Sequence, residues 1–111
     1  MPTPPDDAVR VALSTAPDAE VAARIARALV EERLAACANL LSPVRSIYRW
    51  QGRVEDDTEV LLVIKTRADR VDALAERLRA LHPYDVPELV VLPVDGGLAP
   101  YLDWVRGEAA P

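Results

Sequence analysis

The sequence contains very few of the residues that form covalent or metal cross-links. Among 111 residues there is one cysteine, Cys37, and one histidine, His82. A single cysteine excludes a disulfide within the chain and every zinc site that needs several cysteines. Any metal site must therefore be assembled from other ligands.

The sequence also lacks an excess of positive charge and any long hydrophobic run. The net charge of -5 leaves no basic excess to release counterions from phosphates, which argues against nucleic acid and anionic lipid as partners. No apolar run approaches the length of a membrane span, and residues 1–7 lack the basic start and apolar stretch of a secretion signal. We therefore expect a cytoplasmic protein with no nucleic-acid or membrane partner.

Residues that degrade on heating are rare. Asn39 and Gln51 are the only side-chain amides, Met1 is the only methionine, and there are 10 prolines. This pattern is typical of thermostable proteins from heat-adapted sources. The chain also has 12 arginines against one lysine, Lys65, and this bias can equally reflect codon usage. Both explanations stay open.

The hydrophobic and charged content of the chain is sufficient for one folded domain. Half of the residues are hydrophobic and 28% are charged, which is the balance of a globular protein. Residues 1–7 contain three prolines and two aspartates without periodicity, which predicts a disordered leader. The single domain is expected over residues 8–107, because the last residues should fray.

Four segments have strand character. Apolar and polar residues alternate over 9–14. Residues 37–41 begin a second strand, which resumes after Pro43 and turns near Gly52 into a third strand at 58–66. Residues 89–92 form the fourth.

The third strand contains the unbroken apolar run 60–64. Such a run indicates that both of its faces are covered. Helices in so short a chain can cover one face of a sheet, so the second cover is expected from another copy of the chain.

Helical patterns separate these strands. Asp18 is placed to cap a helix that ends near Leu34, and a second helix over 71–81 is ended by His82-Pro83. A short C-terminal helix begins at Pro100. The resulting βαββαβ order predicts an α+β, ferredoxin-like fold with antiparallel sheet order 4-1-3-2. Pro43 and the prolines flanking 89–92 agree with this order, because it makes their strands the edges.

Several short blocks together resemble one family along residues 9–105. The blocks are Leu13-Ser14-Thr15-Ala16-Pro17, Leu34-Ala35-Ala36-Cys37-Ala38-Asn39, Ser46-Ile47-Tyr48-Arg49-Trp50-Gln51-Gly52, Lys65-Thr66, His82-Pro83-Tyr84 with Pro87-Glu88, and Tyr101-Leu102-Asp103-Trp104. In order and spacing they resemble the CutA family, the divalent-cation tolerance proteins. The resemblance implies a compact homotrimer, similar in architecture to the PII signalling proteins, with a role in tolerance of copper and other divalent cations.

The resemblance also bears on metal ligands. Family members for which copper ligation is described use a cysteine at the position of Ser14 and histidines at those of Leu81 and His82. Only His82 is retained here, so a Cu(II) site would need a carboxylate such as Glu88 or residues of another subunit. The alternative for His82 is a structural role at the C-terminus of its helix.

A ligand-binding cleft is expected around Trp50, Lys65, Tyr84 and Glu88, near His82. The leading hypothesis is a trimeric binding or regulatory module for a divalent metal or a small ligand, which is not an enzyme and has no certain cofactor. One alternative is a small-molecule enzyme in the same cleft, with His82 or Glu88 as the acid-base group and Lys65 as an anion contact. The others are a PII-like ligand sensor that uses the inter-subunit cleft, and a structural scaffold. No nucleophile, base and orienting group form a recognisable catalytic set.

Two further features have simple structural explanations. The apolar neighbours of Cys37 predict a buried, unreactive thiol. The acidic residues 55–57 with Glu59 are expected at a solvated hairpin tip, since their spacing lacks the turn glycine of a calcium loop.

Overall fold

The computed structural model describes residues 3–111 and contains four strands in one antiparallel sheet. The elements are β1 (Val9–Ala16), α1 (Ala19–Glu31), β2 (Cys37–Trp50), β3 (Arg53–Arg67), the 3-10 helix η1 (Ala68–Arg70), α2 (Val71–Leu81), β4 (Val90–Pro93) and α3 (Ala99–Glu108). The strand order is β2-β3-β1-β4, which is the predicted order 4-1-3-2 read from the other edge. The α+β architecture and the βαββαβ order are therefore confirmed.

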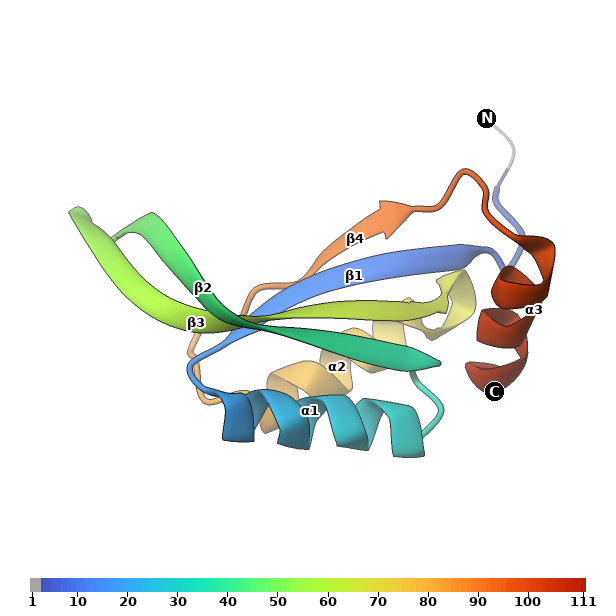
Figure 1. The fold of residues 1–111 in the computed structure, drawn as a ribbon, viewed down its shortest axis with the longest axis horizontal. Helices are drawn as coiled ribbons and strands as arrows, with labels where there is room; N and C mark the ends of the chain where they lie inside the picture. Colours follow the sequence, from blue (N-terminus) through green and yellow to red (C-terminus); the bar gives the residue numbers. More distant parts are fainter. Residues whose placement is uncertain (1–2) are drawn as a thin grey trace.

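The β2–β3 hairpin is the longest feature of the sheet. Gln51 and Gly52 have φ angles of 49° and 79°, so they form a two-residue turn whose twist matches that of the flanking strands. Strand β1 pairs with β3 only as far as Val60, so within residues 3–111 the part of β3 before Val60 has no strand partner on that side. The hairpin therefore projects beyond the rest of the sheet (Figure 1).

Prolines mark the two edges of the sheet as predicted. In β2 the pairing register shifts between Leu41 and Val44, at Pro43, because a proline has no N–H to donate to the ladder. Strand β4 ends at Pro93 on the opposite edge. The kink in β2 and its edge position are thus confirmed.

Helix α1 begins as predicted but ends earlier than the sequence suggested. The Asp18 carboxylate accepts a 2.8 Å hydrogen bond from the Val21 N–H and caps the first turn. The predicted end near Leu34 is wrong, because Arg33 adopts a left-handed φ of 58°. This conformation lets Leu34 N–H donate to Leu29 O at 2.9 Å, so the chain reverses after Glu31 and buries Leu34.

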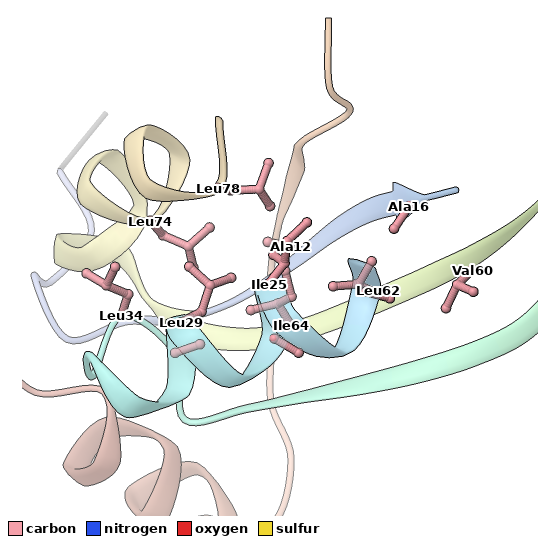
Figure 2. Close-up of a cluster of buried hydrophobic side chains, with 13 residues drawn as sticks. Ala12, Ala16, Ile25, Leu29, Leu34, Val60, Leu62, Ile64, Leu74 and Leu78 are labelled. Atoms are coloured by element: carbon pink, nitrogen blue, oxygen red, sulfur yellow. The ribbon is translucent and has the colours of Figure 1, made fainter. Parts of the chain in front are cut away.

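The main core lies between the sheet and the pair α1 and α2. Ile25 and Leu29 of α1 are fully buried against Leu62 and Ile64 of β3, and Leu74 and Leu78 of α2 complete the cluster (Figure 2). Full burial of each such side chain contributes roughly 1.5–3 kcal/mol to folding. Both helices lie on the same side of the sheet (Figure 1).

The other side of the sheet remains largely uncovered. Side chains alternate along each strand, so Val63, Leu13 and Val90, which are opposite one another across β3, β1 and β4, share this open face. Val90 is 48% exposed. Helix α3 covers only the end near Val9, through Val105 and other apolar residues. The prediction that the chain's own helices cover one face of the apolar run is confirmed.

Cys37 is less buried than the sequence predicted. Cys37 is only partly buried, because it starts an edge strand on the open side, where its Sγ lies 3.7 Å from Tyr101 Oη. Its predicted full burial is therefore wrong.

Within the predicted leader, the Asp6 carbonyl accepts a 2.9 Å hydrogen bond from Asp69 N–H, while Met1 and Pro2 lie outside the described residues.

The helices of residues 3–111 are too short or too polar to cross a membrane.

Candidate functional site

A cleft of about 450 Å³ opens where the β2–β3 hairpin leaves the sheet and faces the loop between α2 and β4. Its remaining wall comes from Thr15 near the end of β1. The charged lining residues are Glu59, Asp85 and Glu88, and the aromatic ones are Tyr48, Trp50 and Tyr84. The cleft is therefore acidic and aromatic, and no Lys or Arg of the described part of the chain belongs to its lining.

Two tyrosine–carboxylate pairs organise this cleft. Tyr84 Oη donates a 2.8 Å hydrogen bond to Glu59 Oε2, and Tyr48 Oη donates a 2.5 Å bond to Asp57 Oδ2. Burial and the bond to Glu59 raise the pKa of Tyr84 above its ordinary value. The bond to Asp57 raises the pKa of Tyr48 to about 12. Both phenols therefore keep their protons at neutral pH and direct them at carboxylates.

The carboxylates of Glu59 and Glu88 are close enough to influence each other. Glu59 is only 8% exposed, and none of the ion pairs within residues 3–111 involves it. Burial, and then the negative charge of Glu59, raise the pKa of Glu88 above its ordinary value. The cleft thus concentrates negative charge that the described part of the chain leaves without a cation.

His82 fixes the loop that carries Tyr84. Its Nδ1 accepts a 3.1 Å hydrogen bond from the Tyr84 N–H, so its Nε2 carries the proton and donates to the Thr15 carbonyl at 2.7 Å. The His82 and Tyr84 rings also contact each other, with centroids 4.6 Å apart. The imidazole therefore positions the cleft tyrosine relative to β1.

The structure shows what occupies the positions associated with copper in the family. Both ring nitrogens of His82 are hydrogen bonded, so a metal would have to replace one of these bonds. Ser14 is fully buried and donates to the Glu88 carbonyl at 2.7 Å, and Leu81 packs against the core. No cluster of three or more metal-ligating side chains occurs within residues 3–111. Metal binding by His82 stays a prediction.

The predicted cleft residues do not all come together. Trp50, Tyr84 and Glu88 line the cleft, whereas Lys65 does not. Lys65 lies six residues beyond Glu59 along β3, roughly 20 Å away at the usual strand rise, and its Nζ donates to Asn39 Oδ1.

Sequence reasoning missed Glu59. It was expected at a solvated hairpin tip, and this expectation is wrong, because the loop carrying Tyr84 folds over it and leaves it almost fully buried. The available signal was its position directly before the apolar run of β3. Asp56, by contrast, is exposed in the hairpin and pairs with Arg45.

Comparison with known proteins gives one consistent result. The family model described as CutA1 divalent ion tolerance protein matches residues 10–108. The divalent-cation tolerance protein CutA of Thermus thermophilus is 56% identical over 96 residues, which are 86% of this chain and 93% of that protein. A solved structure of the T. thermophilus protein superimposes with a TM-score of 0.88 at 54% identity, covering 90% of this chain and 97% of that one.

Human protein CutA is 52% identical over 98 residues, which are 88% of this chain but only 55% of the human protein. The chain thus spans about half the length of its human relative. Relatives are assigned to different compartments, since one from Archaeoglobus fulgidus is described as periplasmic and one from Arabidopsis thaliana as chloroplastic. With the matched sheet order and the match over nearly its whole length, this chain belongs to the CutA family of divalent-cation tolerance proteins.

Proposed function

We propose that this chain is a homotrimeric binding module acting in the response to divalent cations, and that it binds a ligand in the cleft without chemically converting it. The observation that carries the proposal is the makeup of the cleft. Its two phenols are held by hydrogen bonds to carboxylates, Tyr84 to Glu59 of the lining and Tyr48 to Asp57 beside it, and its open volume is in the range of small-molecule sites. Such a site can hold a ligand and report its presence through the hairpin and the loop.

The absence of a catalytic set within residues 3–111 favours binding over turnover. The ring nitrogens of His82 are both engaged by backbone groups, and the Ser14 hydroxyl is buried on a backbone carbonyl. Neither is available as a base or nucleophile for a reacting group in the cleft. Lys65, the expected anion contact of an enzyme, lies outside the cleft lining.

The uncovered sheet face supports assembly. Val63, Leu13 and Val90 form part of an apolar surface that water would contact in an isolated chain. The projecting hairpin adds exposed apolar side chains at Ile47 and Val54, each 65% exposed. Burying these surfaces between three copies around one axis closes the assembly, whereas an unclosed contact would grow into filaments.

The divalent cation that this module would bind is copper or another metal ion, as the family implies. Two routes are open in this chain: direct ligation by His82, and binding beside the carboxylates Glu59 and Glu88. The second route leaves the hydrogen bonds of the imidazole intact and relieves the repulsion between two neighbouring carboxylates. A cytoplasmic location also stays part of the proposal.

Thermal-shift measurement against divalent metals, nucleotides and small organic ions tests the binding proposal, because a ligand that prefers the folded state raises the melting temperature. We expect stabilisation by at least one compound, lost in a Trp50→Ala variant and retained in a Trp104→Phe variant. No stabilisation by any compound, or conversion of a bound compound into product, would refute it. For copper, calorimetry compares a His82→Ala variant with Glu88→Gln. Unchanged Cu(II) affinity in His82→Ala excludes ligation by the imidazole. Loss of most affinity supports ligation only if Glu88→Gln keeps its affinity, because His82 also holds the cleft loop in place.

A further inference from the structure

Among the side chains that line the cleft, hydrogen-bond acceptors outnumber donors. Tyr48 and Tyr84 both use their hydroxyl protons on carboxylates, so toward the cleft they present oxygen lone pairs. Glu59, Asp85 and Glu88 are also acceptors when ionised. A complementary ligand must therefore bring N–H donors.

Glu59 indicates the charge of that ligand. It is more than nine-tenths buried, and the one side-chain hydrogen bond that it makes among the described residues comes from a neutral phenol. Within residues 3–111 no Lys or Arg side chain reaches it, although arginine is abundant in the sequence. Burying a carboxylate without a cation is costly, so a cationic guest would stabilise this part of the protein.

The aromatic wall indicates the shape of the ligand. Trp50 and Tyr48 are both more than two-fifths exposed, although each lines the cleft. Planar cations stack on such faces, and guanidinium groups do so while donating in-plane N–H bonds to carboxylates. The cleft volume of about 450 Å³ greatly exceeds that of a bare metal ion, and the described chain holds no cluster of three metal ligands there.

We infer that the cleft binds an organic cation of the guanidinium type, with its N–H groups on Glu59 and Glu88 and its plane against Trp50. This inference rests on the proposed function, in that it takes the cleft to be the ligand site. It replaces an anionic ligand, which Lys65 would have suggested, with a cationic one.

The guanidinium group has two possible sources. It can belong to a free small molecule, or it can be an arginine of a second copy of this chain. Arg49 and Arg53 are exposed beside the hairpin turn and make no ion pair within residues 3–111. The same chemistry serves both sources, and the experiment separates them.

The test uses calorimetry with three probes of similar size: n-butylguanidinium, the neutral n-butylurea and the anion pentanoate. A Trp104→Phe background leaves Trp50 as the only tryptophan, so its fluorescence reports binding at the cleft. We expect n-butylguanidinium to bind at least about tenfold more tightly than n-butylurea, since hydrogen bonds to charged groups contribute at least that factor. Glu88→Gln should weaken this binding about tenfold, whereas Glu76→Gln, on the exposed side of α2, should leave it unchanged.

Each outcome has one meaning. Binding of n-butylguanidinium to the wild-type protein supports a free ligand, and binding only after Arg49→Gln and Arg53→Gln are combined shows that a second copy supplies the cation. Equal binding of n-butylurea, preference for pentanoate, or no guanidinium binding by either protein overturns the inference. If pentanoate or a metal still binds at Trp50, the proposed function stands and only the ligand class is wrong.

Discussion

His82 Nε2 lies 2.7 Å from the carbonyl oxygen of Thr15, and this contact joins the end of α2 to the end of β1 across 67 positions of sequence. The same ring accepts the Tyr84 N–H on its other nitrogen. One buried imidazole thus holds the loop that forms a wall of the cleft. Its removal should affect the cleft and the fold together.

We expect His82→Ala to lower the free energy of unfolding by about 2 kcal/mol, because it leaves the partly buried Thr15 carbonyl and Tyr84 N–H without their partner and removes a buried ring. Urea denaturation followed by circular dichroism measures the change. Arg79→Ala, an exposed change one turn earlier in α2, should shift the value by less than about 0.5 kcal/mol. Equal stability of the two variants would contradict the positioning role of His82.

The pair Arg67–Asp69 should make stability depend on pH. The Arg67 guanidinium, 2.7 Å from Asp69 at its nearest, holds the pKa of that carboxyl below its ordinary value of 3.8. The depressed pKa means that this stabilisation is present above pH 3.8 and is lost as pH falls through the lower folded-state pKa. Both side chains are mostly covered, and Arg67 also donates to the Arg106 carbonyl of α3.

Asp69→Asn should therefore lower the free energy of unfolding by about 1 kcal/mol at neutral pH. The variant should also lose less stability than the wild-type protein as the pH falls. Thermal unfolding measured across the acidic range provides the comparison. Asp95→Asn, in the exposed loop after β4, is the matched control and should keep the wild-type acid profile. If Asp69→Asn instead shows the wild-type dependence of stability on pH, the Arg67–Asp69 pair does not contribute to acid sensitivity.

Arg33 is strained by its left-handed backbone, with φ of 58°. Glycine adopts this conformation without a Cβ penalty, although it also increases the entropy of the unfolded chain. We expect Arg33→Gly to raise the free energy of unfolding by about 0.5 kcal/mol. The same change at Arg24, in the middle of α1, should lower it by about 1 kcal/mol. Destabilisation by both would show that the arginine side chain matters more than the backbone conformation.

Assembly should depend on the open face of the sheet. Light scattering of the wild-type protein is expected to give three times the chain mass of 12.1 kDa. Val63→Lys places a charge in the middle of that face and should lower the mass, because burying the lysine between copies would cost more than leaving it in water. Val30→Lys, on the exposed surface of α1, should assemble normally.

A second variant tests the hairpin. Tyr48→Pro removes a backbone donor beside the turn and is expected to weaken assembly. A stable wild-type monomer at micromolar concentration would exclude both the trimer and this explanation of the apolar run.

Much of the fold follows from patterns between near neighbours in the chain. The turn at Gln51-Gly52, the cap at Asp18 and the end of α2 before Pro83 depend on backbone geometry that a few consecutive residues impose. Proline placement also identified the edge strands, because the missing N–H excludes a central position. Such features are readable from sequence, since the interacting groups lie within one turn or one ladder step.

The cleft was decided by contacts that no local pattern contains. Glu59 lines the cleft because a loop more than twenty residues later in the sequence places Tyr84 over its side chain. Lys65 lies on the same strand but outside the cleft, because six residues of extended chain separate the two side chains by roughly 20 Å. Likewise, both nitrogens of His82 are committed to backbone groups, one of them on another element. Residue type alone identifies groups capable of binding; their burial and their partners come only from the packing of β1, β3 and the α2–β4 loop against one another.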